Sequence, residues 1–281
     1  MTEPLENPPQ PETPPKLEEG DSRSVITIKA PSPENIWAEI VVVLNYLTRL
    51  SLPLKEEPKP RLVRKAMGWF PLVGAGIGIF GACLDWVMTQ IGLPGIITAT
   101  FAVISMLWLT RALHEEEFAS LVNQYGQTID KEQKTGWLRE ERSVSYGTLG
   151  VILVIIMKIG AIASLSSSDL VFQGLLVSAC WSRALMVVAA AWLRPIDGDP
   201  VATYFQQPPA LRVLLAVIVG AVLTFLALGE DSGVALLTGA GAGLIVAIVG
   251  ANHVRGYNGP LLGTLQQVVE ITVLGTLLAI Q

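Results

Sequence analysis

The chain alternates between long apolar runs and short polar connections. One of eight apolar runs, Ile36 to Leu54, is interrupted by Glu39, Asn45 and Arg49, so it either spans a membrane or lies in the interface. The other seven have close to the roughly 20 apolar residues that a membrane-spanning helix needs. They cover roughly residues 69–91, 95–113, 147–168, 171–193, 210–229, 233–252 and 260–280. This pattern predicts an all-α polytopic membrane protein, with about seven transmembrane helices and one N-terminal interfacial or membrane helix.

Composition agrees with this fold class. Hydrophobic residues make up 51% of the chain and charged residues only 15%, whereas about a quarter of a soluble domain is charged. The mean hydropathy is +0.51. We therefore expect the lipid bilayer as a partner, and no nucleic acid.

The first 35 residues differ from the rest. They contain eight of the eighteen prolines and many charges, and they lack the apolar core of a signal peptide. Such a composition is typical of disorder. We expect residues 1–35 to form a disordered, Pro-rich cytoplasmic tail and residues 36–281 to form the transmembrane domain.

Lysine and arginine residues fall on alternate connections. They precede the 69–91 run and recur within residues 111–142, 194–212 and 255, but they are missing around Leu93, Ser167 and Glu230. Because cytoplasmic loops carry the excess of these residues, we expect a multi-pass inner-membrane protein whose N-terminus and polar loops are cytoplasmic.

Two basic residues lie deep within apolar runs. Lys158 is near the middle of its run, and Arg183 lies about ten residues, or roughly 15 Å of helix, from the inner end of its own. Charges at such depth are costly and usually face a polar interior. We expect both to line a substrate cavity, with Arg183 binding an anion; snorkelling to the surface is the alternative.

The stretch "LHEEEFASLVNQYG", Leu113 to Gly126, follows an apolar run directly. It is either a solvated helix end or part of a charged active site at the membrane surface. We place it in the longest cytoplasmic loop, Leu113 to Tyr146, and expect Glu115 and Glu117 to be solvated.

An ordered series of motifs resembles the cobalamin synthase (adenosylcobinamide-GDP ribazoletransferase) family. "LNYLTRLSLP" resembles the family's opening L-x-x-x-T-R-x-P-x-P, and "FPLVGAGIG" is similar to F-P-L-x-G-x-x-x-G. Leu113-His114 occupies the start of L-H-x-D-G-x-A-D-x-x-D-G. "YGTLG" falls on the end of K-D-S-R-x-G-x-x-G, "SR" at Ser182-Arg183 matches the family's S-R, and "GYNGPLLGT" resembles G-G-x-T-G-D-x-x-G-A. The resemblance runs from about residue 44 to the end.

The resemblance implies a reaction and a metal ion. The family joins α-ribazole or its phosphate to adenosylcobinamide-GDP, releases GMP and needs Mg²⁺. Mg²⁺ held by carboxylates neutralises charge on the phosphates when a phosphoanhydride breaks. In L-H-x-D-G-x-A-D-x-x-D-G, the aspartates fall at i, i+4 and i+7, on one face of a helix.

Most of these aspartates are replaced in this chain. The three on the helix correspond to Glu116, Ser120 and Asn123, that of K-D-S-R corresponds to Ser143, and that of T-G-D corresponds to Pro260. Only Glu116 is a carboxylate, so the Mg²⁺ site is degenerate. The resemblance implies His114 and Glu116 as catalytic residues, a weakened metal site at Glu116, Ser120, Asn123 and Ser143, and substrate binding by Lys158, Ser182, Arg183, Asn258 and Gly259.

Three functions stay open at this point. The first is a ribazoletransferase with a remodelled metal site, acting on a corrinoid nucleotide and ribazole. The second is an inactive relative that binds a corrinoid or assembles with other late cobalamin enzymes. The third is a transporter, against which the chain shows no internal repeat and no paired broken helices.

Overall fold

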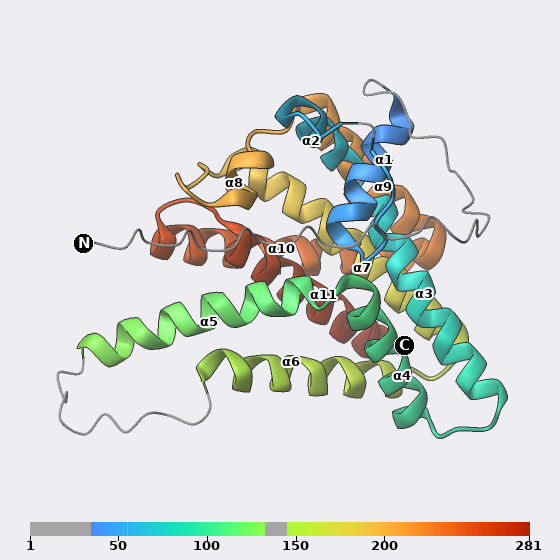
Figure 1. Ribbon diagram of the computed structural model, residues 1–281. Helices are drawn as coiled ribbons and strands as arrows, with labels where there is room; N and C mark the ends of the chain where they lie inside the picture. The colour runs from blue at the N-terminus through green and yellow to red at the C-terminus, as the bar shows by residue number, and fades with distance from the viewer. Residues whose placement is uncertain (1–34, 55, 133–144) are drawn as a thin grey trace, which may run out of the picture.

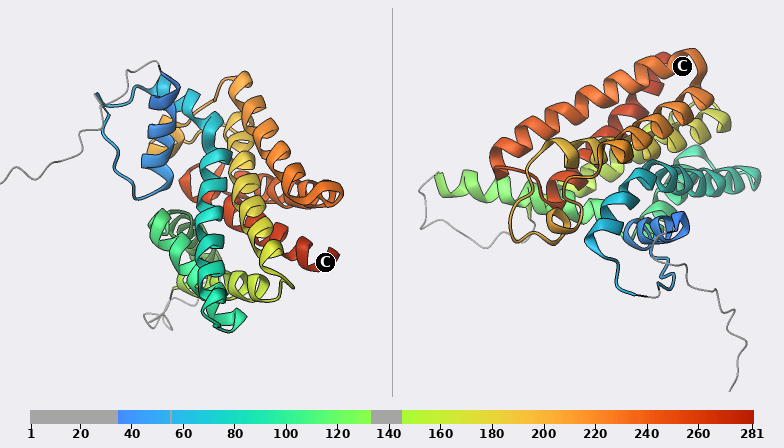
Figure 2. Two further views of the ribbon diagram at one scale, coloured as in Figure 1. Left: turned by 90° about the vertical axis from the view of Figure 1, so that its right-hand side faces the viewer. Right: turned by 90° about the horizontal axis from the view of Figure 1, so that it is seen from above.

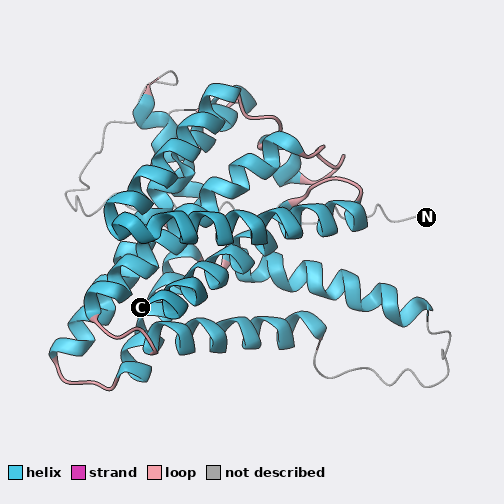
Figure 3. Cartoon of the chain, turned by 180° about the vertical axis from the view of Figure 1, so that it is seen from behind, coloured by secondary structure: helices cyan, strands magenta, loops and turns pink. Residues whose placement is uncertain are grey.

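The computed structural model describes residues 35–54, 56–132 and 145–281, without the side chains of residues 127–132. The predicted tail, apart from Asn35, and Ser143 therefore lie outside the described residues. The described part is helical and contains no strand (Figure 3). Figure 1 labels the helices α1 (Ile36–Leu47), α2 (Pro60–Ala66), α3 (Phe70–Gln90), α4 (Gly95–Thr110), α5 (Leu113–Glu132), α6 (Tyr146–Ala163), α7 (Ser168–Trp192), α8 (Pro200–Tyr204), α9 (Ala210–Leu228), α10 (Ser232–Val254) and α11 (Gly259–Ile280).

Every predicted apolar run contains a helix, which confirms the all-α membrane class, although the run Ile36 to Leu54 is helical only to Leu47. Among the described residues, five segments are long and apolar enough to cross a membrane, or six if the bent pair α4–α5 is one span. One of the five, Ala210–Val254, contains both α9 and α10, joined by the 3₁₀ turn Gly229–Asp231. The exception to the prediction is 95–113, because α4 ends at Thr110 and the chain then turns by 87°.

Helices α7 and α11 form the centre of the bundle. In their apolar windows, 78% and 72% of residues are buried, against 22% for α6 and 17% for the α9–α10 segment. Figure 2 shows α7 between α3 and α9, and α11 packs against α5, α6, α7 and α10. The outer helices therefore present their apolar side chains to lipid, while α7 and α11 carry the interior.

Small residues allow α3 to approach α7 closely. A Cβ atom at Gly74 would lie 2.5 Å from the Ala179 carbonyl oxygen, and one at Gly78 would collide with the Leu175 carbonyl. Such contacts are typical of small residues four apart on membrane helices. This close approach positions the following turn of α7, which carries Ser182 and Arg183.

The basic connections lie together at one end of the bundle. Tyr257 pairs with Arg194 through a backbone hydrogen bond of 2.8 Å, and its hydroxyl donates to Phe205 O at 3.2 Å. The ring of Tyr125, near the end of α5, stacks on His253 with centroids 3.8 Å apart. The structure thus joins the three polar connections that the sequence placed on one side.

Helix α1 is too short to cross a membrane. Its 12 residues span about 18 Å, compared with about 30 Å of hydrocarbon. Glu39 of α1 accepts a hydrogen bond from Trp69 Nε1 at 2.8 Å and pairs with Arg212 Nη2 at 2.7 Å. These contacts fix α1 against α9, and they favour the interfacial alternative for residues 36–54.

Candidate functional site

The site begins at a sharp turn between α4 and α5. Arg111 and Ala112 both adopt left-handed backbone conformations, with φ of 57° and 53°, which are uncommon for residues other than glycine. The Arg111 guanidinium donates to the carbonyls of Asn45 and Thr48 at 3.3 and 3.2 Å. This contact with α1 stabilises the turn, which directs the first turn of α5 into the bundle.

From the sequence we placed the acidic stretch in the cytoplasmic loop Leu113 to Tyr146. In the structure it is not part of a solvated loop. Residues 113–132 form α5, and α5 packs against α11. Glu115 and Glu117 are each 8% exposed, whereas Glu116 is exposed to solvent. The prediction that Glu115 and Glu117 are solvated is wrong, because the turn after α4 places their side of α5 against α11.

Lys158 connects two carboxylates inside the bundle. Its Nζ lies 3.4 Å from Glu115 Oε1 on α5 and 3.2 Å from Glu270 Oε2 on α11. Gln267 Nε2 donates to Glu115 at 2.8 Å, and Gln266 Nε2 donates to Glu270. These five residues form the central charge cluster. Lys158 is 6% exposed, so it is held by ion pairs and does not snorkel.

Arg183 lies beside this cluster without a carboxylate of its own. Its Nη1 donates to Ala179 O at 2.9 Å and to Ser182 Oγ at 3.4 Å. Gln266 also donates to Ser182 Oγ, at 3.4 Å, and so connects Arg183 to the cluster. Arg183 is 2% exposed and forms no ion pair with any described carboxylate. The predicted pair Ser182 and Arg183 therefore faces the polar interior of the bundle.

A second group of side chains gathers at the N-terminus of α11. His114 Nδ1 lies 2.9 Å from Glu117 Oε2, and Glu117 packs so closely that a Cβ atom at Gly259 would be 3.1 Å from its Oε1. Asp199 Oδ1 accepts from the backbone nitrogen atoms of Ala202 and Gly259 at 2.7 and 3.3 Å. Asn258 caps α11 by accepting from Leu261 N at 3.0 Å.

Tyr46 of α1 completes this second group. Its ring is packed with those of Phe70 and Phe205. Burial, followed by the negative charges of Glu117 and Asp199, raises the pKa of Tyr46 well above its usual value. Tyr46 is therefore an uncharged hydroxyl at neutral pH, close to two carboxylates.

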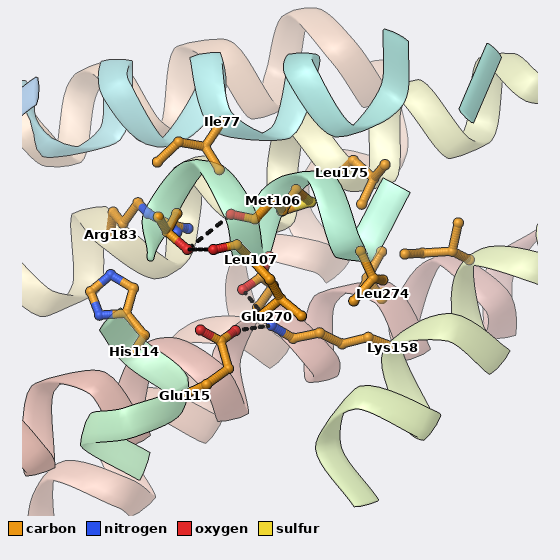
Figure 4. A pocket seen from close by; sticks show the side chains of 13 residues that line it. Ile77, Met106, Leu107, His114, Glu115, Lys158, Leu175, Arg183, Glu270 and Leu274 are labelled. Carbon is orange, nitrogen blue, oxygen red and sulfur yellow. Dashed lines mark hydrogen bonds and ion pairs between the residues drawn. The ribbon is translucent and has the colours of Figure 1, made fainter. Parts of the chain in front are cut away.

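A cavity of about 20 Å³ lies where the two groups meet (Figure 4). Its apolar wall comes mainly from α4, with single residues from α3, α6, α7 and α11, and includes Ile77, Leu107 and Leu175. Its ionisable side chains are those of His114, Glu115, Lys158, Arg183 and Glu270, and the hydroxyl-bearing Thr110 also lines it. Four helices that are distant in sequence, α5, α6, α7 and α11, thus supply one polar surface.

The predicted metal ligands are arranged differently. Glu116 is exposed, Ser120 is half-buried, and Asn123 Oδ1 accepts from Gly147 N at 2.7 Å, so that it holds the start of α6. Among the described residues, no three His, Cys, Asp or Glu side chains are placed to hold a metal ion. The residues therefore do not form a complete Mg²⁺ site by themselves.

The structure brings His114, Lys158, Ser182 and Arg183 together, with Asn258 and Gly259 nearby beside Glu117. Sequence reasoning missed part of both groups. Glu270 could have been found, because it is a lone carboxylate within an apolar run, and such residues usually mark functional sites. No local signal indicated Asp199, Tyr46, or the inward orientation of Glu115 and Glu117.

Comparison with known proteins agrees with this arrangement of motifs. The family model for cobalamin-5-phosphate synthase matches residues 39–278. The adenosylcobinamide-GDP ribazoletransferase of Bradyrhizobium diazoefficiens is 27% identical over 241 residues, covering 85% of this chain and 93% of the relative. That of Shewanella amazonensis is 26% identical over 249 residues, covering 83% and 92%.

The relative from Azorhizobium caulinodans bears the same name and is 26% identical over 249 residues, covering 85% of this chain and 94% of its own. No solved structure matches this chain. The family match extends over most of the chain and includes every helix that builds the polar cavity. The chain therefore belongs to the cobalamin-5-phosphate synthase family.

Proposed function

We propose that the protein is a membrane ribazoletransferase that joins α-ribazole, or its phosphate, to adenosylcobinamide-GDP and releases GMP. The names of its relatives supply the reaction. The observation that carries the proposal for this chain is the polar cavity wall of His114, Glu115, Lys158, Arg183 and Glu270. This wall of ionisable side chains is present although most of the family's motif aspartates are replaced in this chain.

The cost of that wall supports retained function. Ionised side chains inside a membrane bundle are expensive and usually line a substrate or ion path. Replacement of a buried ion pair by apolar side chains is often neutral or stabilising. A chain with no remaining ligand would gain nothing from Lys158, Arg183 and Glu270. A structural role explains the ion pair between Arg212 and Glu39. It does not explain why the buried Arg183 Nε atom has no hydrogen-bond partner.

We assign roles as follows. His114 and Glu116 act as the catalytic residues. Lys158, Ser182 and Arg183 line the substrate site. Asn258 and Gly259, at the start of α11, also bind substrate. Glu116 would hold Mg²⁺ together with the phosphates of the corrinoid nucleotide, since Mg²⁺ commonly takes one or two carboxylates with phosphate oxygens and water, and the ion would neutralise phosphate charge. Ser120, Asn123 and Ser143 are weaker oxygen donors.

The deciding experiment is an assay of the purified protein with adenosylcobinamide-GDP, α-ribazole and Mg²⁺. We expect the condensed corrinoid and GMP in equal amounts, and loss of at least tenfold in rate for Glu116→Gln. Glu230→Gln, which changes an exposed carboxylate in the distant 3₁₀ turn, is the matched control and should behave as the parent.

Absence of product, together with binding of the corrinoid nucleotide, would instead favour the inactive relative. The lost aspartates are the observation that keeps this second candidate in view. In that case the chain would hold a corrinoid, or assemble with other late cobalamin enzymes, without catalysis. Binding of neither substrate would reject both candidates.

A further inference from the structure

Two buried nitrogen atoms beside the cavity lack a hydrogen-bond partner. They are Arg183 Nε and His114 Nε2. Both residues are 2% exposed and both line the cavity, where Figure 4 shows them on the same side. An unsatisfied buried polar atom costs about 1–3 kcal/mol. Two such atoms on residues that line one cavity point to a shared ligand group.

The two nitrogen atoms require opposite hydrogen-bonding roles. Arg183 Nε is always a donor. His114 Nδ1 lies 2.9 Å from Glu117 Oε2, and in the tautomer whose Nδ1 donates to this carboxylate, Nε2 is an acceptor. The shared group must therefore accept from Arg183 and donate to His114.

Size and charge exclude a phosphate in this position. The cavity of about 20 Å³ has room for about one water-sized group, and not for a tetrahedral anion. The cations Lys158 and Arg183 on its wall are balanced by the carboxylates Glu115 and Glu270. No excess positive charge is left to hold an anion.

We infer that the cavity is a hydroxyl-binding site, in which one O–H group accepts from Arg183 Nε and donates to His114 Nε2. A hydroxyl performs both roles, whereas a phosphate oxygen only accepts. The group is a bound water molecule or a sugar hydroxyl of the nucleoside substrate; the second source rests on the proposed function. Arg183 thus recognises a neutral group and not the anion that its sequence position suggested.

The first test needs no substrate. Arg183→Lys keeps the charge but removes the Nε–H donor, and His114→Phe keeps the ring but removes both nitrogens. In thermal unfolding of the full chain in lipid nanodiscs, we expect each variant to lower the melting temperature. The melting temperature of the double variant should be no lower than that of the less stable single variant, because either change already removes the bridge.

Arg212→Lys is the matched control, because Arg212 pairs with Glu39 away from the cavity. Its effect should add to that of His114→Phe. Additive effects of Arg183→Lys and His114→Phe, both without substrate and in the presence of α-ribazole, would overturn the inference. If a variant does not fold, an experimental structure of the parent that resolves water decides: an oxygen atom within about 3.2 Å of both nitrogens supports the site, and its absence overturns it.

The second test identifies the hydroxyl and checks for an anion. If inorganic phosphate stabilises the parent but not Arg183→Lys, the cavity is an anion site and the inference is wrong. For a sugar hydroxyl, we expect a deoxy analogue of α-ribazole to bind the parent at least tenfold more weakly than α-ribazole, with no such difference in Arg183→Lys. For water, the two nucleosides bind alike and the coupling above persists. Failure of α-ribazole to bind at all would reject the proposed function, while the coupling would still decide the cavity.

Discussion

At the scale of single residues, Lys158 stabilises two carboxylates from different helices, Glu115 on α5 and Glu270 on α11. Lys158→Met should lower stability by about 3–5 kcal/mol, because it leaves two buried carboxylates without their cation. Lys158→Met combined with Glu270→Gln should be more stable than Lys158→Met alone. Denaturation of the purified variants measures both effects. A double variant that is weaker than the single one would mean that Lys158 acts mainly by packing.

The same residues show how far the sequence reaches at this scale. Depth within an apolar run identified Lys158 and Arg183 as interior charges, and both are buried. Depth alone did not reveal their partners, because Glu115 and Glu270 are 155 residues apart and meet only through packing of α5 on α11. The motif comparison selected Glu116, whereas its neighbours Glu115 and Glu117 face the interior.

At the scale of helices, the α3–α7 contact offers a matched pair of glycines. A Cβ atom at Gly78 would meet the backbone of Leu175 and Leu176, whereas one at Gly76 would meet nothing within 4 Å. Gly78→Ala should therefore cost about 1–3 kcal/mol, since a backbone cannot move aside cheaply. Gly76→Ala should be neutral or gain up to about 1 kcal/mol from helix propensity. Equal melting temperatures for the two variants would contradict this packing.

The apolar pattern predicted that these helices exist, but it did not predict the direction in which α5 leaves α4. Arg111 and Ala112 contain no turn signal, and residues 95–113 read as one apolar run. The 87° bend depends on contacts with α1, where Arg111 meets the carbonyls of Asn45 and Thr48. A long-range contact that overrides local propensity is invisible to periodicity, and this one decides which face of α5 enters the site.

At the scale of the whole molecule, the bundle has one end with basic connections and one end whose connections lack lysine and arginine. The basic connections join one another through Tyr257 and through the stacked Tyr125 and His253, and the positive-inside rule predicts that this end is cytoplasmic. Cysteines at Asp197 and Tyr204 should then react with a membrane-impermeant maleimide only after cells are opened. Cysteines at Ser166 and Glu230, at the other end, should react in intact cells.

The background for this labelling lacks the two native cysteines, Cys83 and Cys180, of which only Cys83 is exposed. All four labelled residues are exposed and lie between the long helices, so accessibility differs by side of the membrane and not by burial. Labelling of Asp197→Cys or Tyr204→Cys in intact cells would invert the topology. It would also separate the end with basic connections from cytoplasmic nucleotides, and a transferase that uses a GDP-activated substrate could then not work from that face.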